Sequence, residues 1–218
     1  MMAISRIPKH SPEAMKILST LCLLLGVIAT GPGIAYAQKT EALDAGKLDH
    51  LRNAPKVETP ALDVPKSLGA ALAPPPKTIH YDEAKSVKIV PRANGTVEEQ
   101  PFVPIPILFK VNSDNLLDAT SAHNVRLLAQ KLAEIRRSDP AASFVIEGHA
   151  SAEGDDGEHR DLSYRRALRI KALLGELSET PESQLSALGL GEDFARHGAD
   201  APDHLLQEDR RVLVVRTK

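Results

Sequence analysis

The chain has 218 residues, a length that suits one domain with tails or two small domains. Aromatic residues make up only 3% of it, tryptophan is absent and the formal net charge is −2, so neither stacking platforms nor a basic field for nucleic acid is expected. The single cysteine, Cys22, excludes disulfide scaffolds, multi-cysteine zinc sites and CxxC redox chemistry.

The first segment has the pattern of a secretory signal peptide. An uncharged apolar run over residues 17–29 follows a basic start and ends in helix breakers and the triplet 35–37, Ala-Tyr-Ala. We therefore predict a signal peptide over residues 1–37, with export to the periplasm and association with the outer membrane as an open alternative. A second alternative is an uncleaved segment that anchors the protein in the inner membrane, although a span needs about 20 apolar residues.

Residues 38–104 are rich in proline and alanine. The prolines interrupt any helix or central strand, so we predict a largely disordered, semi-rigid linker. A short helix over 41–51 and a strand over 86–90 fit the local pattern, but neither has enough apolar surface nearby to repay its ordering entropy. Such a linker would let the folded domain act at a distance from the start of the exported chain.

From residue 105 to 218 the periodicity is that of a folded α/β domain. Strands are predicted over 105–111, 143–149, 184–190 and 211–216. Two helices with one apolar face each are predicted between them, the first ending at residue 137 and the second running from Asp161 or Ser163 to about 177. This alternation predicts a βαβαβ layer in which helices cover one face of a mixed sheet.

Three short motifs in this domain carry a family resemblance. They are GHASAEG (148–154), LSYRRA (162–167) and DRRV (209–212), and they follow an opening strand that contains Phe109. Their order and spacing resemble the C-terminal peptidoglycan-binding domain of the OmpA-like family, whose pattern runs G-H-T-D-x-x-G, N-x-x-L-S-x-x-R-A and N-R-R-V. The resemblance implies the fold of that family and non-covalent binding of peptidoglycan.

The resemblance also implies a binding site for diaminopimelate, the zwitterionic amino acid of the stem peptide. Its carboxylate is expected on Arg166, because a planar guanidinium binds a carboxylate through two parallel hydrogen bonds. Leu162, one turn earlier on the helix, is expected to line the pocket. The loop after the opening strand is expected to contribute Asn112 or a neighbour.

Two positions depart from the family pattern. Ser151 stands where the family has the aspartate that meets the ligand ammonium, and His159 stands where it has asparagine. Serine carries no charge, so a charge-assisted bond worth about 1.5–3 kcal/mol is lost there. We expect Glu153, in the same loop, to supply the missing carboxylate. The alternative is a domain that keeps the fold, binds peptidoglycan weakly or not at all, and contacts another envelope protein.

The other polar residues of the domain have structural interpretations. We expect Arg210 to pair with loop carboxylates, and Glu147 and His149 to face outward from their strand, the histidine as a satisfied structural residue. No Gly-x-Ser-x-Gly elbow, HExxH or P-loop motif organises the polar groups, so we predict that the protein is not an enzyme. No cofactor and no metal site is predicted.

Overall fold

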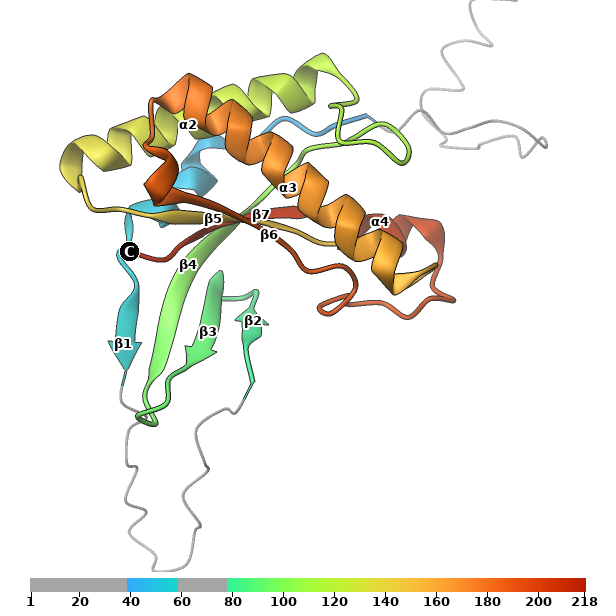
Figure 1. The fold of residues 1–218 in the computed structure, drawn as a ribbon, viewed down its shortest axis with the longest axis horizontal. Helices are drawn as coiled ribbons and strands as arrows, with labels where there is room; N and C mark the ends of the chain where they lie inside the picture. Colours follow the sequence, from blue (N-terminus) through green and yellow to red (C-terminus); the bar gives the residue numbers. More distant parts are fainter. Residues whose placement is uncertain (1–38, 59–77) are drawn as a thin grey trace, which may run out of the picture. The chain divides into compact units, whose positions relative to one another are not determined.

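The fold was analysed in a computed structural model that describes residues 39–58 and 78–218. The described residues belong to one unit, Lys39–Lys218, in which helices pack against a sheet (Figure 1). The predicted signal peptide, residues 1–37, lies outside the described residues. Among those that are described, we find no helix with the length and apolarity of a membrane span.

The strands form a mixed sheet. In chain order the elements are the 3-10 helix η1 (Ala45–Arg52), β1 (Lys56–Glu58), β2 (His80–Asp82), β3 (Val87–Pro91), β4 (Val97–Ile105), α2 (Ala119–Ser138), β5 (Phe144–Gly148), α3 (Asp156–Ser178), the 3-10 turn η2 (Glu182–Gln184), β6 (Leu185–Gly189), α4 (Asp203–Asp209) and β7 (Val212–Arg216). The sheet order is β2-β3-β4-β7-β5-β6, and β1 pairs beside β4. Strands β5 and β6 are parallel, and the other pairs are antiparallel.

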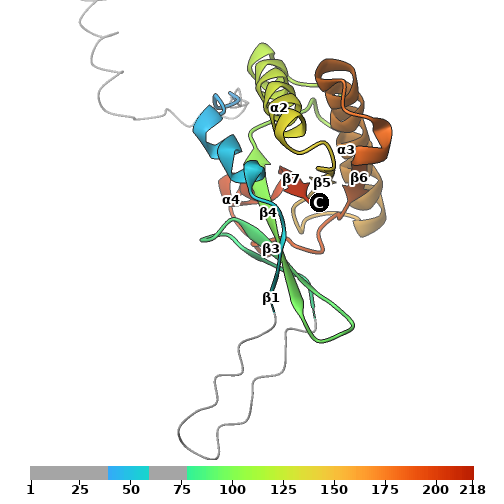
Figure 2. The ribbon, with the colours of Figure 1, turned by 90° about the vertical axis from the view of Figure 1, so that its left-hand side faces the viewer.

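Helices α2 and α3 lie side by side on one face of the sheet, as Figures 1 and 2 show. The core beneath them is made of alternate residues of β5 and β7 and the apolar stripes of both helices: Phe144, Ile146, Val212, Val214, Leu128, Leu132, Ile170 and Leu174. Each such side chain contributes about 1.5–3 kcal/mol by leaving water. The predicted fold class, with helices covering one face of a mixed sheet, is confirmed.

Two predicted boundaries are wrong. The opening strand β4 covers Val97–Ile105, whereas the sequence predicts residues 105–111, which mostly form the loop after it. Helix α3 begins at Asp156, earlier than predicted, because Asp155 caps it by accepting a hydrogen bond from Glu158 N at 3.0 Å.

The two prolines of β4 occupy places where no sheet hydrogen bond is lost. The amide of Phe102 donates to Ser86 O at 2.9 Å, on the β3 side. Because amides alternate in direction along a strand, the nitrogen of Pro104 faces the same side, beyond the end of β3. The nitrogen of Pro101 faces the other side of β4. On that side the pairing with β1 stops at Glu99 and the pairing with β7 begins at Phe102, so Pro101 lies between the two pairings. Proline therefore does not exclude a strand here.

The prediction of a largely disordered linker over residues 38–104 is wrong for the residues of that range that the structure describes. They contribute η1 and β1 to β4, and η1 lies beside α2 (Figure 2). Leu48 and Leu51 of η1 are buried in the main core, and Leu43 N donates to Asn124 Oδ1 of α2 at 3.0 Å. Contacts with distant parts of the chain thus repay the ordering cost, and local apolar content does not reveal them.

Strands β2 and β3 cover part of the sheet face opposite the helices. Tyr81 of β2 packs edge-on against Phe102 of β4, with ring centroids 5.6 Å apart. The Glu147 carboxylate is fully buried and accepts hydrogen bonds from Lys88 Nζ at 2.5 Å and from the Tyr81 hydroxyl at 2.7 Å. His149 is also buried, with Nε2 3.8 Å from Glu147 Oε2. The expectation that Glu147 and His149 face outward is therefore wrong, because the segment predicted as a linker covers them. The expectation of a satisfied histidine is also wrong, since neither ring nitrogen of His149 has a hydrogen-bond partner among the described residues.

The buried cluster keeps one ion pair beside neutral rings. Burial alone would raise the pKa of the Glu147 carboxyl, but His149, Lys88 and Tyr81 hold that pKa below its usual value. Burial lowers the pKa of His149, although the neighbouring carboxylate opposes the shift. Burial and the Glu147 charge raise the pKa of the Tyr81 hydroxyl. The directions of these shifts favour an ionised Glu147 carboxylate beside a neutral imidazole and a neutral phenol.

Replacing Lys88 by methionine should strongly destabilise the domain. The substitution leaves the buried Glu147 carboxylate without its cation, a change that typically costs about 3–5 kcal/mol. Urea unfolding measures the loss. Lys85→Met is the matched control: it removes an exposed lysine 3.6 Å from Asp82 and should change the free energy of unfolding by less than about 1 kcal/mol. Equal stability of the two variants would contradict the importance of the buried pair.

Asp118 should give the domain part of its acid sensitivity. Its Oδ1 accepts a hydrogen bond from Ser121 N at 2.7 Å, which caps α2, and its Oδ2 accepts one from Thr40 N at 3.2 Å. The bond from the Ser121 amide lowers the pKa of the Asp118 carboxyl from 3.8 to about 2. Because the folded-state pKa is depressed, this contribution is present above about pH 4 and is lost as the pH falls toward 2.

Asp118→Ala should therefore lower the free energy of unfolding by about 1 kcal/mol at neutral pH. Its stability should also fall less steeply than that of the parent between about pH 4 and pH 2. Asp118→Asn keeps an acceptor for the cap without a titrating charge, so it should show the same weak acid dependence at higher stability. A parent and an Asp118→Ala protein with parallel acid unfolding curves would refute this assignment.

Candidate functional site

The predicted site is arranged around the N-terminal half of α3, which lies against the ends of β5 and β6. A Cβ on Gly148 would lie 2.2 Å from the backbone oxygen of Ser163, and a Cβ on Gly189 would lie 2.5 Å from Tyr164 Cβ. No side chain fits at either strand end, so glycine is required at both. This close approach fixes the position of α3 along its axis and its rotation about that axis. It thereby fixes the position of Arg166, which lies on the next turn.

Arg166 is held by the loop that follows β4. Its Nε donates to Ser113 O at 3.1 Å, and its guanidinium lies over the Phe109 ring, 5.0 Å from the centroid. The loop is closed by a bridge between Phe109 and Leu116. Among residues 39–58 and 78–218, no carboxylate pairs with Arg166 and no acceptor lies in hydrogen-bond range of its two terminal nitrogens.

The surroundings of Arg166 are electropositive. Burial lowers its pKa, the charges of Arg210 and Arg165 lower it further, and Asp114 raises it. A guanidinium remains charged under such conditions. The structure thus holds a half-buried cation, near a second one, without a counter-ion from the described part of the chain.

Arg210, just before β7, binds the glycine-rich loop that follows β5. Its Nε donates to Ser151 Oγ at 3.1 Å, its guanidinium pairs with the Glu153 carboxylate, and its Nη1 lies 3.4 Å from Asp203 Oδ1 of α4. The prediction that Arg210 pairs with a loop carboxylate is confirmed. Glu153 is therefore already neutralised, and it would have to release Arg210 to meet a ligand ammonium. Its role in ligand binding stays a prediction.

The other predicted site residues lie in the same elements with fewer contacts. His159, in the first turn of α3, has its ring against Gly154, where a Cβ would come within 2.9 Å, and its Nδ1 lies 3.7 Å from Glu192 Oε2. Leu162 is half-buried on α3, and Asn112 is exposed in the loop after β4 with a left-handed φ of 49°. Their roles in ligand binding stay predictions.

Sequence reasoning missed the charged neighbour of Arg166. Asp114 stands next to Ser113, whose carbonyl binds Arg166, yet no motif marks it. The only signal was its nearness in sequence to Asn112. The second cation, Arg210, could be found from the DRRV motif, but its nearness to Arg166 could not.

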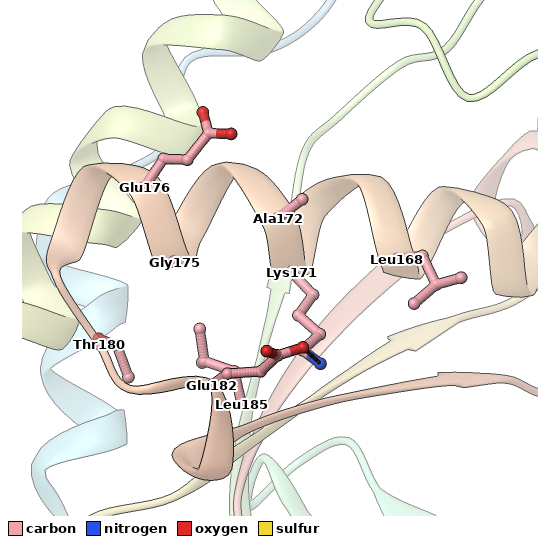
Figure 3. A pocket seen from close by; sticks show the side chains of 8 residues that line it. All are labelled: Leu168, Lys171, Ala172, Gly175, Glu176, Thr180, Glu182 and Leu185. Carbon is pink, nitrogen blue, oxygen red and sulfur yellow. Dashed lines mark hydrogen bonds and ion pairs between the residues drawn. The ribbon is translucent and has the colours of Figure 1, made fainter.

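A separate pocket lies between the C-terminal half of α3 and the start of β6 (Figure 3). Leu168 and Leu185 supply apolar lining, and the Lys171–Glu182 ion pair, at 3.1 Å, lies among the lining side chains. None of the predicted site residues lines this pocket. Within the described ranges, no group of three or more histidine, cysteine or acidic side chains is placed to hold a metal ion.

Residues 108–204 match the model of the OmpA family. This match confirms the resemblance drawn from the motifs, over a segment that contains α2, β5, α3 and β6. No match was found among curated proteins.

Several solved structures are similar. The peptidoglycan-associated lipoprotein from Burkholderia pseudomallei is 21% identical, with a TM-score of 0.43 over 51% of this chain and 88% of that chain. The periplasmic domain of Helicobacter pylori MotB is 18% identical, with a TM-score of 0.40 over 64% of this chain and 85% of that chain. The cell wall anchor of the T6SS from Pseudomonas aeruginosa is 17% identical, with a TM-score of 0.40 over 61% of this chain and 87% of that chain. The fold is assigned from the architecture and the family match.

Gly148→Ala should destabilise the domain, because the added methyl group would lie 2.2 Å from the Ser163 backbone oxygen. Overpacking of this kind costs about 1–3 kcal/mol. Gly175→Ala is the matched control: no neighbouring atom lies within 4 Å of its added Cβ, and alanine in a helix interior gains up to about 1 kcal/mol over glycine. Thermal unfolding should shift in opposite directions for the two variants. A Gly148→Ala protein as stable as the parent would show that α3 does not need this contact.

Proposed function

We propose that this protein is a non-enzymatic component of the cell envelope that binds peptidoglycan non-covalently through the diaminopimelate of the stem peptide. The match to the OmpA family covers α3 and most of the loops around it, which supports a binding domain of this type. A signal peptide over residues 1–37 would deliver the protein to the periplasm, with outer-membrane association and an inner-membrane anchor as its two open variants.

The observation that carries the proposal is that the Arg166 side chain is held in place but has no carboxylate partner among the described residues. Its guanidinium is fixed by Ser113 O and the Phe109 ring, and its terminal nitrogens have no acceptor among the described residues. A guanidinium presents parallel N–H groups that match the two oxygens of a carboxylate, which a lysine cannot do. Because the group is already oriented, a ligand carboxylate would bind without a large cost for ordering the side chain.

The surrounding charges suit an anionic ligand group. The charge of Arg210 acts on Arg166 and lowers its pKa, although the Glu153 and Asp203 carboxylates pair with Arg210, whereas Arg166 has no carboxylate partner among the described residues. Ser151 is an unsuitable nucleophile, since its hydroxyl oxygen accepts a hydrogen bond from Arg210 instead of facing a base. This arrangement supports recognition of a carboxylate over acyl-transfer chemistry.

Arg166→Ala should weaken binding of the purified protein to cell-wall sacculi by about ten- to a hundredfold, the equivalent of one charge-assisted interaction. Arg166→Lys should weaken it nearly as much, because lysine keeps the charge and loses the parallel donors. Co-sedimentation with sacculi over a concentration series measures both. Arg169→Ala, which removes an exposed arginine from the same helix, is the matched control and should bind like the parent.

Equal binding by the Arg166→Ala and Arg169→Ala proteins would refute the proposal. The alternative function, a scaffold domain that contacts another envelope protein, has one observation in its favour: Ser151 offers no charge where the family has an acid. It predicts that a partner protein is captured by the parent and by Arg166→Ala alike, with no sacculus binding by either.

A further inference from the structure

The acidic side chains near the two arginines differ in whether they are already paired. Glu153 and Asp203 both pair with Arg210, the second at 3.4 Å. Asp114 is half-buried in the loop that holds Arg166 and makes no hydrogen bond or ion pair with any residue that the structure describes. It is therefore the acid beside the site whose charge is still available.

The backbone around Asp114 is held firmly. Ser113 N donates to Lys110 O at 3.1 Å, and Lys110 N donates to Asn115 O at 2.9 Å. The Ser113 hydroxyl accepts hydrogen bonds from Asn115 N at 3.0 Å and from Asn115 Nδ2 at 2.9 Å. Arg166 Nε donates to Ser113 O, and Asp114 is the next residue of the same closed loop. The cation and the acid are therefore held close to each other by one loop.

We propose that Asp114 binds the ammonium group of the zwitterionic centre whose carboxylate lies on Arg166. This inference rests on the proposed function and names the acid of that site. The two side chains interact electrostatically without forming an ion pair with each other, which leaves both charges free for a ligand. A zwitterion placed between them would bring each of its charges out of water next to an opposite one, so neither is desolvated unpaired.

The ligand class follows from this assignment. A stem peptide with a free amine on its diaminopimelate offers the required ammonium, whereas one with an acylated amine, as in a cross-link, does not. Ser151 cannot replace the acid, because it is uncharged and its hydroxyl oxygen is bound by Arg210. The site should therefore select uncross-linked stem peptides.

The test is a calorimetric titration of the full chain with a diaminopimelate tripeptide and with the same tripeptide acetylated on its free amine. The parent should prefer the free amine by about tenfold or more. Asp114→Asn should lose about tenfold in affinity for the free-amine peptide and bind both peptides about equally. Glu153→Gln tests the competing acid: the variant should keep the preference of the parent if Asp114 binds the ammonium, because the Glu153 carboxylate pairs with Arg210.

Each outcome separates this inference from the proposed function. If Arg166→Ala loses binding but Asp114→Asn keeps the preference for the free amine, Asp114 is not the acid and the proposed function stands. If Glu153→Gln abolishes the preference, Glu153 takes the ammonium. A parent that binds both peptides equally overturns the selectivity, and a parent that binds neither overturns the proposed function as well. Thermal unfolding of Asp114→Asn, expected to match the parent, excludes loss of the fold as the cause.

Discussion

Helix α3 meets the ends of β5 and β6 without any side chain between them, since both strands finish in glycine at the contact. The same contact is fastened by Ser163, whose hydroxyl accepts a hydrogen bond from Gly191 N at 3.1 Å. A shift of the helix by one residue would turn it by about 100°, and Arg166 would no longer reach the carbonyl of Ser113. The orientation of the guanidinium, and with it every role proposed for the site, depends on two positions that carry no functional group.

Most of the part of the chain after residue 118 could be predicted because its helices and strands carry their own periodicity, and the motifs placed Arg166 correctly on α3, although the start of α3 was predicted too late and α4 was not predicted. The strands before it could not. Lys88 resembles a solvent-exposed linker residue until its partner Glu147, 59 positions later, is known. Site chemistry shows the same limit: the sequence places Glu153 in the right loop, but its neutralisation by Arg210, 57 positions away, appears only in three dimensions.

The replacement of an acid by Ser151 changes the charge balance of the whole site. An acid at that position would face Arg210, whose Nε now donates to the serine hydroxyl. Without that charge, Arg210 pairs with Glu153 and Asp203 instead. The acids near Arg210 are thereby used within the protein, and the charges left for a ligand lie on Arg166 and the loop after β4. Under the proposed function, the substitution would move the acidic side of the site to the loop after β4 without removing it.

The buried pair beneath the sheet connects the segment before β4 to this site. Glu147 is the last side chain of β5 before Gly148, and the next residue, His149, donates its amide to Arg211 O at 3.0 Å. Arg211 follows Arg210 in the chain. The loop that carries Ser151 therefore begins at the hydrogen bond between His149 and Arg211, next to the buried pair of Lys88 and Glu147. A domain cut at residue 105 would lose Lys88 and Tyr81 and would therefore expose the Glu147 carboxylate and the His149 and Phe194 rings, which pack against Tyr81. The strands that resemble a linker in sequence therefore belong to the framework that holds the binding loops.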